Sequence, residues 1–265
     1  MIEWFSNFCY PIQALIASLF TWGITALGAA VVFFCKKINK NFMDGSLGLA
    51  AGVMLAATFW SLLQPAIDMA NELKLIPWFV VSLGIILGGV LLYFGDKIFD
   101  YFSKKKNCDN SKLKRCTMLI ASITLHNIPE GMAIGVAFGS IAYNISGANL
   151  GAAIMLAIGI GLQNFPEGSA VSLPLRREGL SRSKAFLIGN LSGIVEPISA
   201  VIGAILVMKI RILLPILLAF AGGAMIYVVT QELIPESQQN KKKDLMTVFT
   251  MIGFIIMMIL DISLS

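Results

Sequence analysis

The chain has 265 residues, of which 57% are hydrophobic and only 13% are charged. A typical soluble domain carries about 25% charged residues, so this composition excludes a soluble domain and predicts an integral membrane protein. The formal net charge of +5 does not indicate nucleic-acid binding, because the basic residues are sorted by membrane side.

Eight apolar stretches predict an all-α, polytopic membrane protein with eight transmembrane helices. A bilayer core of about 30 Å requires about 20 apolar residues per helix. The stretches lie near residues 12–34, 43–66, 77–99, 117–139, 150–175, 185–208, 212–235 and 245–262. We therefore expect residues 1–265 to form a single transmembrane domain with a Lys-rich cytoplasmic loop near 100–116. No loop is long enough for a soluble domain, and no Walker A motif for ATP binding occurs.

The basic residues predict the orientation in the membrane. Three follow the first stretch, seven lie between Lys97 and Arg115, four follow the fifth stretch and three follow the seventh. Only Lys74, Lys209 and Arg211 are left for the other side. Because cytoplasmic loops are rich in Lys and Arg, we expect both termini outside and a multi-pass protein of the plasma (inner) membrane.

Small residues recur at four-residue spacing in several stretches, as at Gly48 and Gly52, Gly84 and Gly88, and Gly131, Gly135 and Gly139. Such spacing allows helix backbones to approach closely in lipid. We interpret most of these glycines as helix-packing positions.

A seven-residue pattern occurs twice, in the middle of the fourth and fifth stretches. Residues 125–131 read Leu-His-Asn-Ile-Pro-Glu-Gly, and residues 162–168 read Leu-Gln-Asn-Phe-Pro-Glu-Gly. The first copy holds the only histidine of the chain. A carboxylate at the bilayer centre costs about 2.5–3.5 kcal/mol on insertion scales, and proline disrupts the helix that carries it. A glutamate and a proline at the same positions of both copies predict a functional polar site.

The spacing within each copy places its polar side chains together. Residues four apart share a helix face and lie about 6 Å apart along the axis, which pairs His126 with Glu130 and Gln163 with Glu167. The two asparagines lie about 100° round, next to these faces. Consecutive spans run antiparallel, so the copies should face each other as an inverted pair. Inverted repeats with broken helices near the midplane recur at transporter sites, and we expect both prolines to kink their helices.

These side chains suit a divalent metal ion. Two carboxylates, one imidazole and three carboxamides supply the oxygen and nitrogen donors that bind Zn²⁺, Fe²⁺, Mn²⁺ or Cd²⁺. Without a cation, Glu130 and Glu167 held close would repel each other, and a divalent metal removes that repulsion. The sixth stretch adds Glu196, a third carboxylate that is also followed by a proline.

Four other interpretations of the polar residues are available. The side chains could tie helices together by hydrogen bonds alone, which three glutamates with three prolines make the weaker explanation. An intramembrane metalloenzyme would require a motif such as HExxH, which is absent, so we expect no enzyme. A carrier of small organic cations would favour aromatic walls, whereas the neighbours are aliphatic apart from Phe165. A metal-gated channel or membrane metal sensor that uses the same site stays open as the alternative.

The motifs resemble the ZIP family of divalent-metal transporters, most closely its bacterial GufA-type branch. The likeness extends over the whole chain and rests on the two copies at 126–131 and 163–168. Residues 191–197 resemble the sixth helix of the family, residues 54–61 its second and residues 231–236 its seventh. The resemblance implies a ZIP-like inverted-repeat helix bundle and a homodimer. It also implies that spans one, four, five and six carry the metal.

The resemblance also implies a binuclear metal site. The first metal would bind His126, Glu130, Gln163 and Glu167, with Ser61 nearby. The second would bind Asn127, Asn164 and Glu196, with Met54 added, and would share Glu130 and Glu167. The transport path would continue at the cytoplasmic end past Gln231, Glu232 and Glu236. Asp68 and Glu72, at the outer end of the second span, are candidates for its beginning, although solvated loop charges are the simpler interpretation.

The chain departs from the family pattern in four places. Many members carry histidine where Gln163 and Gln231 stand here, and some relatives carry aspartate at the place of Asn164. The loop near 100–116 has no histidine, although many members have a histidine-rich loop there. The resulting hypothesis is import of Zn²⁺, or also of Fe²⁺, Mn²⁺ or Cd²⁺, into the cytoplasm by alternating access without ATP. Divalent ions, the lipid bilayer and a second copy are the expected partners, with no resident cofactor and no nucleic acid.

Overall fold

The computed structural model describes residues 2–34, 40–105, 111–143, 148–177 and 179–264, without the side chains at 2–3, 96, 99–100, 102–123, 177 and 264. All regular structure in the described residues is helical. The α-helices are α1 (Ile2–Ser6), α2 (Tyr10–Phe34), α3 (Lys40–Ala57), α4 (Gln64–Glu72), α5 (Pro77–Lys105), α6 (Ser111–Ser140), α7 (Leu150–Arg177), α8 (Arg182–Leu191), α9 (Val195–Lys209), α10 (Leu214–Val228), α11 (Ile234–Ser237) and α12 (Lys243–Leu264). Short turns of other helix types are η1 (Thr58–Leu63), η2 (Ile141–Tyr143), η3 (Arg211–Leu213) and η4 (Val229–Leu233).

In the described residues, 7 helical stretches are long and apolar enough to cross a membrane. They coincide with seven of the predicted spans, and several helices continue through a neighbouring turn. The remaining predicted span, 117–139, falls on helix α6, whose side chains are described only from Thr124 onward. Helices α5 and α6 also extend into the predicted loop near 100–116, and residues 106–110 lie outside the described residues. The chain is therefore a multi-pass helical membrane protein.

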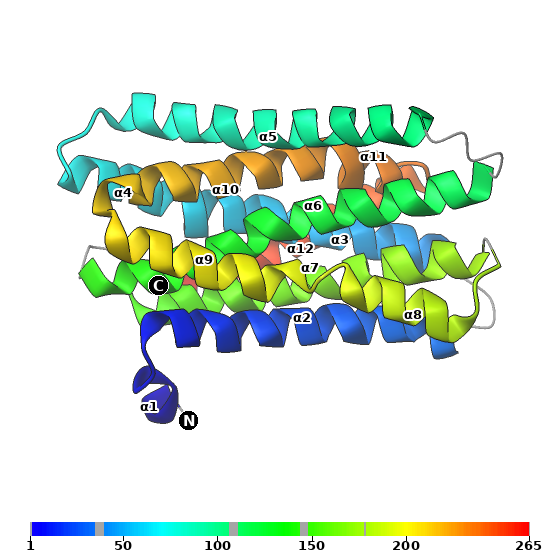
Figure 1. Cartoon of the computed structure of the whole chain (residues 1–265), viewed down its shortest axis with the longest axis horizontal. Coiled ribbons are helices and arrows are strands. Elements are labelled where there is room, and N and C mark those ends of the chain that lie inside the picture. The colour runs from blue at the N-terminus through cyan, green and yellow to red at the C-terminus, as the bar shows by residue number, and fades with distance from the viewer. Residues whose placement is uncertain (1, 35–39, 106–110, 144–147, 178, 265) are drawn as a thin grey trace.

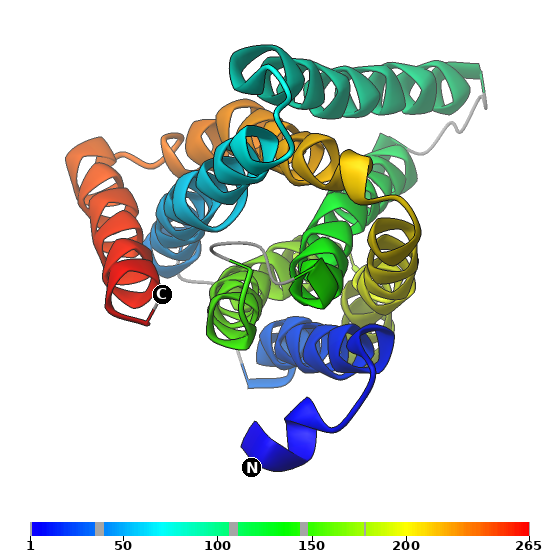
Figure 2. The ribbon, with the colours of Figure 1, turned by 90° about the vertical axis from the view of Figure 1, so that its left-hand side faces the viewer.

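The helices form two groups that pack along a shared boundary (Figures 1 and 2). Helices α2, α6, α7 and α8–α9 contact one another in the first group. The second group contains α3–α4, α5, α10–α11 and α12, with α5 and α12 on its outside (Figure 2). Contacts of α3 with α7 and of α10 with α6 join the groups. The two copies of the repeated motif, on α6 and α7, therefore lie in the same group.

Glycines allow the closest helix pairs to approach. The dominant pairs are α2 with α7, α6 with α9, α3 with α12 and α5 with α10. At one glycine of each pair, a Cβ atom would collide with a backbone carbonyl of the other helix: Gly168 with Thr25, Gly135 with Ala200, Gly52 with Thr250, and Gly88 with Phe220. The expected helix-packing role is confirmed at Gly52, Gly88 and Gly135.

Two helices contain a π-type turn that the sequence did not predict. In η1 the amide of Gln64 donates to the carbonyl of Phe59, and in η4 the amide of Ile234 donates to the carbonyl of Val229. Each bond reaches back five residues instead of four, and a proline follows each turn after one further residue. The longer turn moves the backbone past the position where the proline ring would clash. Asp68 and Glu72 consequently lie in helix α4, so the interpretation as loop charges is wrong.

The prolines of the repeated motif do not break their helices. Pro129 lies inside α6 and Pro166 inside α7, and both helices are continuous. The broken helix expected near the site is found instead in the sixth span, where α8 ends at Leu191 and α9 begins at Val195. Gly193 lies in this interruption and Pro197 removes a backbone donor just after it. The predicted span 185–208 is thus two helices.

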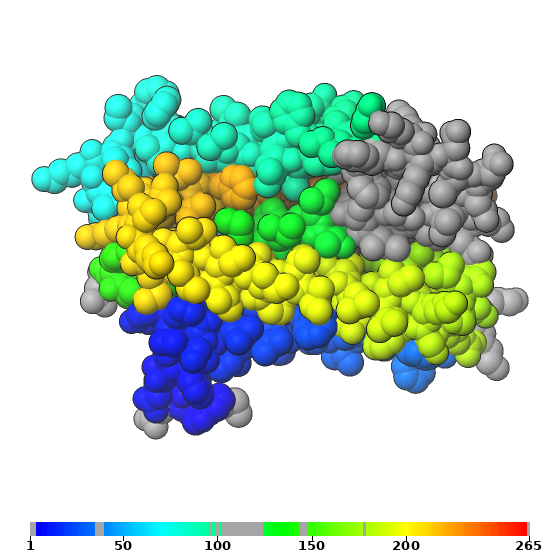
Figure 3. All heavy atoms as spheres, viewed as in Figure 1, coloured from blue at the N-terminus to red at the C-terminus, as the bar shows by residue number. Residues whose placement is uncertain are grey.

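Both ends of the chain lie at the same end of the bundle (Figures 1 and 2). Helix α1 protrudes from the body next to the start of α2 (Figure 3). The connections α7–α8 and α11–α12 lie at the opposite end (Figure 1).

Candidate metal centre

The repeated motif supplies six buried polar side chains from two neighbouring helices. On α6 these are His126, Asn127 and Glu130, and on α7 they are Gln163, Asn164 and Glu167. None of the six is more than 6% exposed to solvent. They lie in the middle of both helices, which matches the positions expected from the sequence.

One hydrogen bond joins the two copies directly. The amide Nε2 of Gln163 donates to Oε1 of Glu130 over 2.7 Å. The carboxylates of Glu167 and Glu196 also interact electrostatically with Glu130. The two motif copies therefore meet at Glu130, and the other two carboxylates lie near enough to interact with it electrostatically.

The two asparagines are held by their amide nitrogens. Nδ2 of Asn127 donates to the carbonyl oxygen of Ser192 over 2.9 Å, in the interruption between α8 and α9. Nδ2 of Asn164 lies 3.3 Å from the carbonyl oxygen of Thr21 on α2 and also bonds Glu196. Each asparagine thus reaches a backbone carbonyl on a helix outside the motif pair.

Five buried oxygen atoms of the motif have no hydrogen-bond partner. They are Oδ1 of Asn127, Oε2 of Glu130, Oε1 of Gln163, Oδ1 of Asn164 and Oε1 of Glu167. Buried polar atoms are normally satisfied, and these five have in common that they are acceptors. A cation is one partner that would satisfy such a group of acceptors.

His126 connects this cluster to helix turn η4. Its Nε2 lies 3.4 Å from Oε1 of Glu232, and the side chain of Glu232 is 32% exposed. Glu232 also interacts electrostatically with Glu167. The predicted metal ligand and the predicted path residue are therefore direct neighbours.

Glutamate, aspartate, histidine and cysteine side chains do not suffice by themselves. Within the described ranges, no three of these side chains converge closely enough to hold a metal ion. The carboxamides of the motif must complete any metal centre here.

The remaining predicted site residues lie around the cluster in different environments. Oγ of Ser61 donates to Oδ1 of Asp261 on α12 over 2.6 Å. Gln231, just before Glu232, and Glu236, one turn after it, are exposed. Asp68 accepts a hydrogen bond from Nε2 of Gln64 over 3.0 Å.

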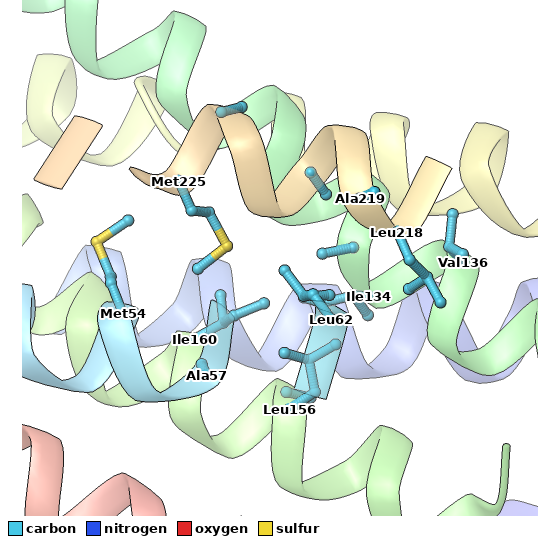
Figure 4. Close-up of a cluster of buried hydrophobic side chains, with 14 of the residues drawn as sticks. Met54, Ala57, Leu62, Ile134, Val136, Leu156, Ile160, Leu218, Ala219 and Met225 are labelled. Atoms are coloured by element: carbon cyan, nitrogen blue, oxygen red, sulfur yellow. The ribbon is translucent and has the colours of Figure 1, made fainter. Parts of the chain in front are cut away.

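Met54 is fully buried among apolar side chains between the two helix groups (Figure 4). The same cluster of apolar side chains also contains Leu62, Leu156, Ile160 and Met225. On α6, Ile134 follows Glu130, and on α7, Leu156 and Ile160 precede Gln163. The apolar cluster therefore lies on the side of the polar site toward the chain termini, and the polar exit residues lie on the other side.

Two partners of the site were missed from the sequence. Asp261 is a carboxylate inside the last apolar stretch, so the reasoning that selected Glu130 would have found it as well. Thr21 donates to Oε2 of Glu196 over 2.6 Å. Threonine is common in membrane helices, so no local pattern predicts this contact.

The fold and the site together define a class. The chain is a polytopic helical membrane protein with a cluster of buried polar side chains where the two motif copies meet. Residues 113–261 match the family model described as "ZIP Zinc transporter". The chain belongs to the ZIP family, which confirms the resemblance derived from the motifs.

Three relatives illustrate the extent of the match. The chain is 36% identical to the zinc transporter ZIP11 of Bos taurus, over 96% of this chain and 97% of the relative. It is 34% identical to the zinc transporter GufA of Myxococcus xanthus, over 95% of this chain and 98% of the relative. It is 36% identical to the zinc transporter ZIPB of Bordetella bronchiseptica, over 95% of this chain and 81% of the relative.

Proposed function

We propose that this chain imports Zn²⁺ across the plasma (inner) membrane into the cytoplasm, without ATP, through the site between α6 and α7. Its relatives in three organisms are named zinc transporters. The observation that carries the proposal is the group of five buried oxygens without a hydrogen-bond donor. Fe²⁺, Mn²⁺ and Cd²⁺ share the required ligand chemistry and are candidates for further substrates.

In this proposal the metal exchanges its water for protein ligands at His126, Glu130, Gln163 and Glu167. The carboxylates supply negative charge, and the imidazole supplies a nitrogen ligand that zinc binds well. Because ligands must be deprotonated, binding releases protons. The bond from Gln163 to Glu130 keeps one carboxylate oxygen occupied until a metal ion replaces the amide hydrogen.

The metal then leaves toward the cytoplasm past Glu232 and Glu236. The 3.4 Å separation between His126 and Glu232 supports this direction, since the ion can pass from one ligand to the next without a long unliganded step. On the opposite side, Leu62, Leu156 and Ile160 are buried, and each is at most 1% exposed to solvent. The described conformation therefore fits a transporter that is closed to the outside and open toward the inside.

Alternating access would come from movement between the two helix groups. The group of α2, α6, α7 and α8–α9 contains most of the proposed ligands, so we propose that it carries the metal. The second group would form the scaffold of a homodimer. Eight spans with both termini outside complete the proposed arrangement, in which the basic residues face the cytoplasm.

Uptake into liposomes with an enclosed zinc-sensitive dye tests this function. We expect Glu130→Ala, Glu167→Ala and His126→Ala each to lower the initial rate at least tenfold, because each removes a ligand. A saturable rate in the wild type distinguishes a carrier from an open channel. Undiminished zinc flux in all three variants would falsify the proposal.

A further inference from the structure

Several hydrogen-bond donors of the protein hold the carboxylate of Glu196. Its side chain is fully buried, at 0% exposure. Oε2 accepts from the hydroxyl of Thr21 over 2.6 Å, and Nδ2 of Asn164 lies 2.9 Å from Oε1 and 3.0 Å from Oε2. An ionised carboxylate offers about four acceptor positions, and three of them are taken here. A charged acceptor makes each of these bonds short and strong.

These contacts also fix the orientation of Asn164. Its nitrogen has two hydrogens, and three oxygens surround it, namely both carboxylate oxygens of Glu196 and the carbonyl of Thr21. A flipped amide would place its own oxygen against all three, so the observed orientation is strongly preferred. Oδ1 therefore points away from Glu196, and it is buried without a partner.

Asn127 is oriented in a corresponding way with neutral partners only. Its nitrogen donates to the carbonyl of Ser192, and its Oδ1 is likewise buried without a partner. Both asparagines thus offer an oxygen to the site. Asn164 differs in that its amide nitrogen also donates to the carboxylate of Glu196, which in turn accepts from the hydroxyl of Thr21. This difference indicates the role of Glu196.

We propose that Glu196 is a positioning residue, held by Thr21, that orients Asn164 toward a single metal ion. The inference rests on the proposed function of the site. The amide hydrogens of Asn164 lie where the second cation of a binuclear site would bridge residue 164 and Glu196. The chain therefore holds one transported ion at this centre, whereas the family resemblance implies two.

The substitution Asn164→Asp tests this idea most directly. It would place a carboxylate oxygen about 2.9 Å from Glu196 in place of a donor. Two facing carboxylates at that distance repel unless a cation lies between them. The variant should therefore gain a second metal, whereas Asn164→Ala, which removes the amide without adding charge, should not.

Metal content provides the measurement. Tag-free protein in detergent is dialysed against increasing free Zn²⁺, and bound zinc per chain is determined by elemental analysis. We expect saturation at one ion in the wild type and in Glu196→Gln, and at two ions in Asn164→Asp. Saturation of the wild type at two ions would overturn the proposal whether or not a variant folds. Loss of one of those ions in Glu196→Gln would then show that Glu196 is a ligand.

Thr21 provides an independent test through transport kinetics. Thr21→Val removes the hydroxyl that holds Glu196, so we expect the KM for zinc to rise about threefold or more at nearly unchanged kcat, because one charged hydrogen bond is lost. Thr21→Ser should restore the wild-type KM, and an equal defect in both variants would contradict the positioning role. Undiminished zinc uptake in Glu130→Ala, Glu167→Ala and His126→Ala would instead defeat the proposed function, so the two failures are distinguishable.

Discussion

Gln163 is the residue at which the two motif copies meet, because its amide donates to Glu130 over 2.7 Å. A carboxamide is a weak zinc ligand, whereas imidazole suits Zn²⁺ well. The bond also occupies one of the two oxygens of Glu130 in the metal-free site. In the proposed function, Gln163 would therefore lower the affinity of the centre in two ways.

We predict that Gln163→His lowers the KM for zinc uptake by about threefold or more and changes the KM for Mn²⁺ less, since nitrogen ligands favour zinc over manganese. Competition uptake in liposomes measures both constants. Gln163→Leu is the matched control, because it removes the ligand and the hydrogen bond together, and its KM should rise. A histidine variant that behaves like the leucine variant would contradict this role.

For single residues, the sequence predicted which side chains form the site but not which partners hold them. The side chains of the repeated motif were predicted because charged groups in apolar stretches stand out, and helix spacing placed them on shared faces. The partners of those side chains were not predictable. Thr21 and Glu196 are 175 positions apart, and Ser61 and Asp261 are 200 apart. Such contacts depend on which helices pack together, and a single sequence does not reveal that.

Irregular turns within a helix determine the direction in which its polar side chains point. Turns η1 and η4 each hold a predicted site residue: Ser61, predicted near the first metal, and Glu232, predicted on the transport path. A π-type turn adds a residue to the helix and rotates the next turns by a large angle relative to a regular helix. The prolines at 65 and 235 come one residue after the ends of these turns. Interruption was expected at the prolines of the repeated motif because a sequence pattern treats every helix proline alike.

Glycine packing between α5 and α10 offers a matched pair of neighbouring positions. A Cβ atom at Gly88 would collide with the carbonyl of Phe220, whereas one at Gly89 would meet nothing within 4 Å. We predict that Gly88→Ala destabilises the protein by about 1–3 kcal/mol through overpacking. Gly89→Ala should be neutral or stabilising by up to about 1 kcal/mol, because alanine is the better helix former.

Thermal unfolding in detergent, followed by intrinsic fluorescence, measures the difference. The two variants carry the same chemical change on the same helix, so helix propensity cancels in the comparison. Equal melting temperatures for both variants would show that α5 and α10 pack less closely than the collision at Gly88 implies.

Across the whole molecule, the two sides of the metal centre differ in chemistry. Toward the chain termini the centre is covered by fully buried apolar side chains, including Leu62 and Ile160 (Figure 4). Toward the opposite end, Glu232 is partly exposed and Glu236 is exposed. The clustering of basic residues at that same end predicts that it is the cytoplasmic side. The more exposed side of the site is then the cytoplasmic side, toward which zinc moves in the proposed import.

This arrangement depends on the orientation of the bundle, which native Cys9 can report. Cys9 is a free, exposed thiol between α1 and α2, at the end of the bundle that holds both termini. With Cys35, Cys108 and Cys116 replaced by serine, we predict that a membrane-impermeant maleimide labels Cys9 in intact cells. Lys241→Cys, exposed in the connection between α11 and α12, is the control in a background without Cys9. Because the positive-inside rule places that connection in the cytoplasm, it should be labelled only after permeabilisation. The reverse pattern would invert the bundle, and the site that faces inward in the present proposal would then face outward.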